Sequence, residues 1–188
     1  MRKLKLQMQI TLDGFVAGPN GENDWVFTSG PDEAGVRKVA ELADTADTLL
    51  IGRKSAQSGF IDYWKNVAEN EPDSPWNAFA KLMVNHRKIV FSRTGASFSG
   101  NNVEVENGDL ATAIQALKNE PGKDILVYGG VDFARSLVDL NLVDEYLFFI
   151  CPVAIGSGLS IFKDRKLLKL EDSIPYKSGK LLNRYTPA

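Results

Sequence analysis

Three segments of the chain carry glycines, or cations together with hydroxyls, that suit phosphate binding. They are Gly52-Arg53-Lys54-Ser55, Ser92-Arg93-Thr94 and Gly129-Gly130. Backbone N–H groups at glycine turns and helix starts, together with forked arginine side chains, are common donors to phosphate oxygens. One such segment alone is more often a solvated strand end or a tight turn. Three of them, each following an apolar run, indicate a site for a nucleotide or for another phosphorylated ligand.

Nucleophiles and metal ligands are scarce in this sequence. With one cysteine, Cys151, and one histidine, His86, the chain can form neither an intrachain disulfide nor a zinc site of Cys and His ligands, so no metal is expected. We predict that His86 lies at the surface and that Cys151, within an apolar run, belongs to the core. G-x-G-x-x-G, P-loop and G-x-S-x-G motifs are absent. A bound cofactor must therefore supply the reactive group.

Alternating strand and helix patterns predict where the three segments lie in the fold. Strands are predicted over residues 4–12, 48–51, 88–92, 103–105, 124–128, 146–151, 167–170 and 181–185. Helices are predicted to begin at Pro31, after Ser74-Pro75 and after Asp109, and to span 131–140. Helices between the early strands imply parallel crossovers, which bring the carboxyl ends of the strands to one edge. The helix-poor C-terminal part implies antiparallel strands, so we expect one α/β domain over residues 1–188 with a mixed, mostly parallel sheet.

Composition narrows the possible partners. The chain has 188 residues, 22 Lys and Arg against 24 Asp and Glu, and a formal net charge of −2. A general nucleic-acid binder would show a basic excess, so none is expected. The longest apolar run, residues 146–156, is about half of a membrane span, and no targeting segment is visible. A cytoplasmic location and a small-molecule partner are the expectations.

Five motifs occur in an order that resembles a known family. Residues 12–21, Leu-Asp-Gly-Phe-Val-Ala-Gly-Pro-Asn-Gly, with Asp24-Trp25-Val26 after them, resemble the opening of dihydrofolate reductase-like proteins, in particular the branch with the riboflavin biosynthesis reductase domain (the RibD C-terminal domain). The later motifs are 50–55, 88–93, 127–131 and 152–158 with Ile161-Phe162. The resemblance implies a three-layer α/β/α fold with a mixed, mostly parallel sheet and an antiparallel C-terminal hairpin.

The resemblance also implies NADPH as cofactor. In such proteins the segment matching Gly52-Arg53-Lys54-Ser55 holds phosphates, and the one matching Ser92-Arg93-Thr94 meets the adenosine 2′-phosphate. Gly129-Gly130-Val131 would approach the pyrophosphate, and Ala17 would lie near the nicotinamide. The expected activity is NADPH-dependent reduction of a small pteridine- or pyrimidine-like ring, including the 5-amino-6-(5-phosphoribosylamino)uracil reductase type of reaction.

Three carboxylates are candidates for supplying a proton. Folate reductases use one in the first helix, which here begins with Asp32-Glu33 in a register that matches poorly, whereas Asp13 fits the riboflavin branch better. Each has a structural alternative, because Asp13-Gly14 suits a turn and acidic residues favour a helix start.

Aromatic side chains are the candidates for packing the substrate ring, although each would also suit the core. They are Phe15, Trp25, Trp64 and Phe162. An alternative function is a non-catalytic NADPH-binding sensor or assembly module. The resemblance further implies a homodimer, for which strand 146–151 is a possible contact.

Overall fold

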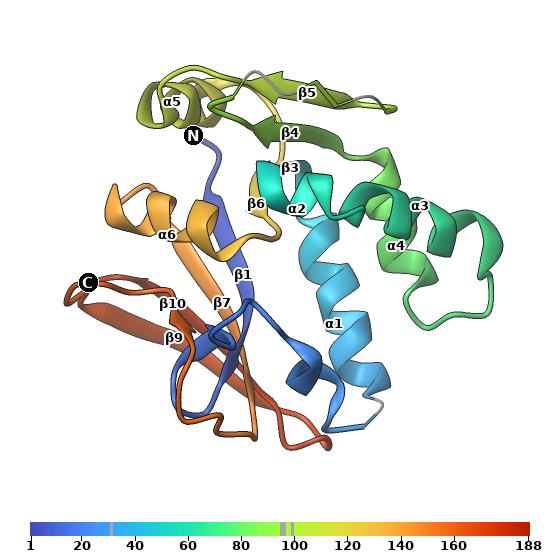
Figure 1. Ribbon diagram of the computed structural model, residues 1–188, viewed down its shortest axis with the longest axis vertical. Coiled ribbons are helices and arrows are strands. Elements are labelled where there is room, and N and C mark those ends of the chain that lie inside the picture. The colour runs from blue at the N-terminus through green and yellow to red at the C-terminus, as the bar shows by residue number, and fades with distance from the viewer. Residues whose placement is uncertain (31, 95–96, 99) are drawn as a thin grey trace. The chain divides into compact units, whose positions relative to one another are not determined.

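The computed structural model describes residues 1–30, 32–94, 97–98 and 100–188 (Figure 1). Its elements are β1 (Leu4–Thr11), β2 (Phe15–Ala17), the 3₁₀ helix η1 (Asp24–Phe27), α1 (Glu33–Asp44), β3 (Ala46–Gly52), α2 (Arg53–Gln57), α3 (Phe60–Asn70), α4 (Asn77–Asn85), β4 (Arg87–Phe91), β5 (Val103–Glu106), α5 (Leu110–Asn119), β6 (Asp124–Val127), α6 (Val131–Asp139), β7 (Glu145–Cys151), β8 (Leu159–Ser160), β9 (Leu168–Pro175) and β10 (Leu181–Pro187).

The strands pair as the alternation of elements predicts. Their order is β5-β4-β3-β6-β1-β7-β10-β9, and β2 pairs with β8 separately. β3 runs parallel to β4 and β6, β4 to β5, and β1 to β7, whereas β10 is antiparallel to β7 and β9. The mixed, mostly parallel α/β sheet with an antiparallel C-terminal hairpin is confirmed.

The chain divides into two compact units. The first comprises residues 1–4 and 33–130, and the second comprises 5–32 and 131–188. In the first unit, successive residues of β4 face opposite sides of the strand. The Lys88 ammonium group donates hydrogen bonds to backbone carbonyls at the end of α4. Ile89, on the other face, lines the same cavity as Ala113 and Leu117 of α5. Helices therefore cover both faces of these strands.

The second unit contains most of β1 together with β7, β10, β9, the β2–β8 pair and α6. Leu4 and Leu6 of β1 are buried, as its alternation predicts, whereas Leu12 lies beyond the end of the strand and is 70% exposed. The opposite face of β1 is polar and yet also buried at Lys5, Gln7 and Thr11. The sequence pattern alone would assign that face to solvent, so the structure adds a buried polar row to the second unit.

Several local predictions need correction. His86 is only 9% exposed, and its Nε2 lies 3.0 Å from the carbonyl of Ala43. The prediction of a surface histidine is therefore wrong, because the end of α4 packs against the end of α1. Cys151 is buried, as predicted.

The helix predicted after Ser74-Pro75 begins at Asn77, and the Ser74 hydroxyl accepts from the Trp76 N–H instead of capping the helix. Pro31 lies outside the described residues, and α1 begins at Glu33. The sequence analysis missed α2, α3, β2 and β8. No helix within the described residues is long and apolar enough to span a membrane.

Candidate functional site

The three segments that the sequence suggests for phosphate binding follow three neighbouring strands of the first unit. In the register of β3, Gly52 lies beside Phe91 of β4, and Leu50 lies beside Val127 of β6. All three strands are parallel, so the residues that follow them leave the sheet at the same edge. Parallel pairing thus brings together segments that are at least 35 residues apart in the sequence.

Gly52, Ser55 and Gly129 form the closest part of this edge. Gly52 ends β3 in an extended conformation, and α2 begins at the next residue. Gly129 has a φ of +107°, and a Cβ added to it would lie 3.3 Å from Ser55 Oγ and 3.4 Å from Ser55 Cβ. A side chain at Gly129 would be strained and would crowd the Ser55 hydroxyl. Because residue 129 is a glycine, no side chain separates its backbone from the Ser55 hydroxyl.

The cations of the same edge are partly or fully exposed to solvent. Arg53 is half-buried and donates from Nη1 to Gln57 Oε1 at 2.7 Å, one turn along α2. Lys54 and Arg93 are exposed. Ser92 is buried, with its hydroxyl 3.3 Å from Thr94 Oγ1. The arrangement offers positive charge and hydroxyl donors next to a glycine turn, which suits a phosphorylated ligand.

Ala17 lies in the second unit, where β2 and β8 approach each other at backbone distance. Ala17 is paired with Leu159 and Phe15 with Ser160. A Cβ added to Gly158 would lie 2.3 Å from the carbonyl oxygen of Ala17. Only glycine therefore allows this approach, and the backbone of Gly158 fixes the position of Ala17.

Asp13 anchors two loops of the second unit. Its carboxylate accepts from the Thr11 hydroxyl at 2.6 Å and from the backbone N–H groups of Ile155 and Gly156 at 3.0 and 2.8 Å. The hydrogen bond from Thr11, followed by those from the backbone, lowers the pKa of Asp13. These contacts favour the structural interpretation of Asp13, because an ionised carboxylate held in this way has no proton to give near neutral pH.

Asp32 and Glu33 belong to different units. Asp32 is half-buried and accepts a hydrogen bond from Ser178 in the turn between β9 and β10. Glu33 is exposed in the first turn of α1, where it complements the helix dipole. Val131, the remaining predicted cofactor residue, is the first residue of α6.

The candidate aromatic residues have different surroundings. Trp25 in η1 is 5% exposed, and its Nε1 is buried without a hydrogen-bond partner. Phe162 packs against Tyr146 and Phe148, with ring centroids 6.0 and 6.1 Å apart. Trp64 lies in the first unit, in a cluster of rings that indicates a core role. This cluster contains Phe60, Tyr63, Trp76 and Phe79.

Gln7 is a residue that the sequence analysis missed. It is 5% exposed, and its Oε1 is shielded from solvent without a hydrogen-bond partner. Gln9, two residues further along the same face of β1, accepts from Cys151 Sγ at 3.4 Å. Buried polar atoms normally have partners, but Gln7 Oε1 and Trp25 Nε1 have none in the described part of the chain, a property that they share with Ser29 Oγ and Trp64 Nε1. The only sequence signal was the polar alternate positions of β1.

The RibD C-terminal domain family matches residues 2–181 of the chain. The chain belongs to this family. The uncharacterised protein YyaP of Bacillus subtilis is 34% identical to this chain over 182 residues, which are 95% of this chain and 91% of YyaP.

Solved structures confirm the fold of this RibD C-terminal domain protein. A diaminohydroxyphosphoribosylaminopyrimidine deaminase/5-amino-6-(5-phosphoribosylamino)uracil reductase from Thermotoga maritima matches with a TM-score of 0.65 and 18% identity, over 100% of this chain and 57% of that one. A dihydrofolate reductase from Enterococcus faecalis, in complex with NADP(H), matches with a TM-score of 0.62 and 12% identity, over 98% and 96%. At these identities the likeness concerns the fold. The dihydrofolate reductase-like architecture that the motifs implied is therefore confirmed.

Proposed function

We propose that the protein is an NADPH-dependent reductase of a small pyrimidine- or pteridine-like compound. Membership in the RibD C-terminal domain family supports a reductase-like function. The observation that carries the proposal is the alignment of Gly52-Arg53-Lys54-Ser55, Ser92-Arg93-Thr94 and Gly129-Gly130 at neighbouring parallel strand ends. The approach of Gly129 to Ser55 leaves that turn free of side-chain bulk, so these residues fit a pyrophosphate-containing cofactor.

The cofactor, when bound, would supply the hydride, and the chain would supply binding and orientation. Arg53 and Arg93 are the candidates for the 2′-phosphate that distinguishes NADPH from NADH, because guanidinium groups form charge-assisted pairs with phosphate oxygens. Ser55, the Gly129-Gly130 turn and Val131 are the candidates for the pyrophosphate. Ala17 is the candidate for contact with the nicotinamide.

The second unit supplies the candidate substrate contacts. Trp25 Nε1 is a donor and Gln7 Oε1 an acceptor, both buried and without partners. A heterocycle that carries both ring carbonyls and N–H groups would satisfy them, as pyrimidines and pteridines do. Phe15 and Phe162 are half-buried and offer apolar surface for the ring. Because Asp13 is held as a carboxylate, we assign it to anchoring, and Asp32 is the better candidate for supplying a proton.

Cofactor titration tests this function. We expect the wild-type protein to bind NADPH more tightly than NADH, measured by cofactor fluorescence. Replacing both Arg53 and Arg93 with alanine should reduce this preference by about tenfold or more, the size of one lost charge-assisted hydrogen bond. Arg165→Ala, in an exposed segment of the second unit, is the matched control and should leave the preference unchanged.

The outcomes separate the possible functions. Substrate-dependent loss of reduced-nicotinamide absorbance with pyrimidine or pteridine compounds would support the enzyme. NADPH binding without turnover of any such compound would favour a non-catalytic sensor or assembly module. No binding of either nucleotide would contradict the proposal and leave another phosphorylated ligand as the occupant.

A further inference from the structure

Arg135 connects α6 to the β2–β8 pair. α6 begins at Val131, directly after the Gly129-Gly130 turn, and Arg135 follows one turn later. Its side chain is 19% exposed. Nε and Nη2 both donate to the carbonyl oxygen of Ser160, at 3.1 and 2.5 Å. The guanidinium thus holds one backbone atom of β8 with two hydrogen bonds.

The carbonyl that Arg135 holds belongs to a very small sheet. β8 is two residues long and β2 three, and they pair at Phe15 with Ser160 and at Ala17 with Leu159. A two-stranded pair of this length is not stable alone in water. Its geometry therefore depends on what anchors it to the rest of the unit.

The chain next to β8, which Arg135 anchors, lies in close contact with the backbone of Ala17. Gly158 approaches Ala17 so closely that an added Cβ would lie 2.3 Å from the Ala17 oxygen and 3.1 Å from Phe15 side-chain atoms. Close-packed backbone contacts transmit displacements instead of absorbing them. A shift of β8 would therefore move Ala17 as well.

We propose that Arg135 is a positioning residue that sets Ala17, through β8, relative to the helix that follows the glycine turn. The functional part of this inference rests on the proposed cofactor site, in which Gly129-Gly130 meets the pyrophosphate and Ala17 the nicotinamide. Arg135 would then fix, within the second unit, the spacing between Ala17 and Val131 at the start of α6, which are candidates for contact with the nicotinamide and the pyrophosphate. An arginine suits this role because its planar fork defines a direction as well as a distance, which a lysine ammonium does not.

Hydrogen exchange of the ligand-free protein tests the link without any cofactor. In Arg135→Met, which keeps the aliphatic stem, we expect faster amide exchange in residues 15–17 and 159–160 and unchanged exchange in β7 and β10. Asp132→Asn is the matched control, because it removes the 3.9 Å ion pair between Asp132 and Arg135 and leaves both donors to the Ser160 carbonyl in place, so it should leave exchange unchanged. Should Arg135→Met fail to fold, Arg135→Lys is expected to show a smaller increase at the same residues.

A binding comparison tests the functional consequence. Adenosine 2′,5′-bisphosphate carries the 2′-phosphate and adenosine of NADPH but no nicotinamide. We expect Arg135→Met to bind this fragment as wild type does and to bind NADPH about tenfold more weakly, in line with the loss of a charge-assisted hydrogen bond. Arg135→Lys should recover part of the NADPH affinity.

The two measurements give distinct outcomes. Unchanged exchange in residues 15–17 in every Arg135 variant would overturn the link. Faster exchange together with equal losses for the fragment and NADPH would overturn the positioning role, because the effect would then extend beyond the nicotinamide end. Faster exchange in a protein whose wild type binds neither compound would overturn the proposed function, and with it the cofactor part of this inference, while the anchoring of β2–β8 by Arg135 would stand.

Discussion

At the scale of single residues, Gly158 has the tightest surroundings among the described glycines. An added Cβ would meet a backbone oxygen at 2.3 Å, and a backbone atom cannot turn away as a flexible side chain does. We therefore expect Gly158→Ala to lower the free energy of unfolding by about 1–3 kcal/mol, as overpacking of a close contact does. Chemical denaturation measures the loss.

Gly156→Ala is the matched control within the same Gly-Ser-Gly motif. Gly156 has a φ of +76° but no atom within 4 Å of an added Cβ. Its substitution should cost only the backbone strain, about 1 kcal/mol. Equal losses in the two variants would show that the approach of Gly158 to Ala17 does not limit stability.

Asp13 gives a pH-dependent prediction. Its pKa is lowered mainly by the Thr11 hydrogen bond, so the folded protein favours the carboxylate. The stabilisation that Asp13 provides should be present above its ordinary pKa of 3.8 and should be lost as the pH falls through the lower folded-state pKa. Asp13→Ala should therefore lower the melting temperature at pH 7, and its difference from wild type should shrink below pH 3.8. A difference that persists unchanged in acid would contradict an anchoring carboxylate.

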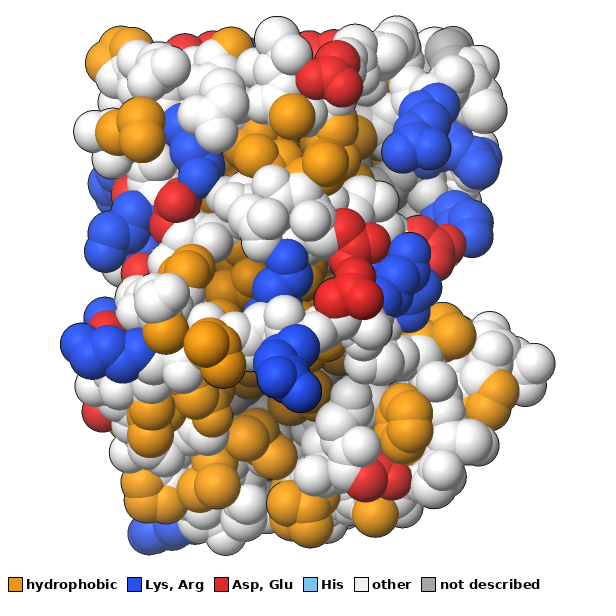
Figure 2. All heavy atoms as spheres, turned by 90° about the vertical axis from the view of Figure 1, so that its left-hand side faces the viewer, with side chains coloured by type: hydrophobic (Ala, Val, Ile, Leu, Met, Phe, Trp, Pro, Cys, Tyr) orange, Lys and Arg blue, Asp and Glu red, His pale blue; other side chains and the backbone are white. Residues whose placement is uncertain are grey.

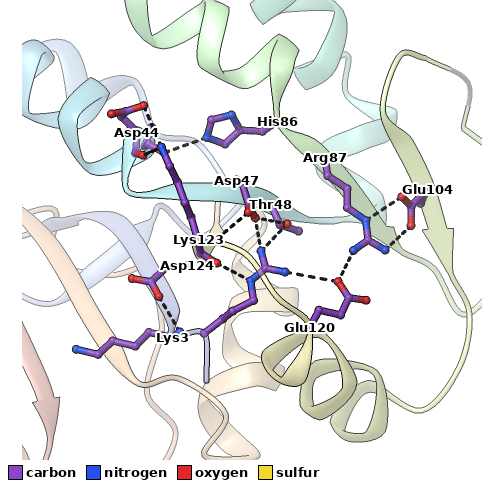
Figure 3. A network of polar contacts seen from close by, with 12 residues as sticks. Lys3, Asp44, Asp47, Thr48, His86, Arg87, Glu104, Glu120, Lys123 and Asp124 are labelled. Atoms are coloured by element: carbon purple, nitrogen blue, oxygen red, sulfur yellow. Dashed lines mark hydrogen bonds and ion pairs between the residues drawn. The ribbon is translucent and has the colours of Figure 1, made fainter.

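At the scale of elements, an ion-pair network joins the amino ends of the strands in the first unit. Figure 3 shows Arg87 between Glu104 and Glu120, with N–O distances of 2.7 and 2.6 Å. Arg2, whose side chain is 4% exposed, donates to the Thr48 hydroxyl at 2.7 Å and pairs with Asp47. The network ties the start of the chain to β3 and, through Glu120, to the end of α5.

We expect Arg2→Met to lower the free energy of unfolding by about 2 kcal/mol at pH 7, because it leaves buried acceptors without a donor. Solvent screens the ion pair with the partly exposed Asp47, so the hydrogen bonds account for most of the loss. Lys3→Met, at an exposed neighbouring cation, should change stability by less than about 0.5 kcal/mol. Denaturant titration of both variants compares them.

The same network fixes the direction of its pH dependence. Burial opposes ionisation of Asp47, but hydrogen bonds from Thr48 and the Lys123 N–H, together with Arg2, lower its pKa overall. Arg87 lowers the pKa of Glu104. The folded protein therefore binds fewer protons than the unfolded chain, and its stability should fall as the pH drops below the ordinary pKa values of 4.5 and 3.8 and through the lower folded-state values. In Arg2→Met this acid dependence should be weaker, and an unchanged dependence would contradict the assignment.

At the scale of the whole molecule, the homodimer stays a prediction, but the contact suggested for it is wrong. β7 lies between β1 and β10, and most of its side chains are buried, so strand 146–151 cannot reach a partner. Exposed apolar side chains occur instead around β9, at Leu167 and Leu170. Figure 2 shows hydrophobic side chains gathered on the lower part of one face, where the β9–β10 hairpin lies.

Sedimentation velocity measures the oligomeric state directly. We expect a species of about twice the 20.7 kDa of the chain, which is the arrangement that the family resemblance implies. A single species at the monomer mass across the accessible concentrations would contradict the homodimer.

The sequence by itself determined the class of fold and the edge at which to look for the site. Apolar periodicity marked most strands and helices, and the parallel crossovers that it implied place Gly52, Ser92 and Gly129 at neighbouring strand ends. It could not show the short strands β2 and β8, because three- and two-residue strands carry too little periodicity to recognise.

The tertiary structure alone decided which polar groups of the second unit have hydrogen-bond partners and which have none. Arg135 meets Ser160 across 25 residues, and Asp13 meets Gly156 across 143. Gln7 and Trp25 acquire buried, unpartnered atoms only when the sheet and η1 enclose them. These contacts depend on long-range packing, whereas periodicity reports only local preference. For this reason the strand ends of the first unit could be read from the sequence, and the anchors of Ala17 could not.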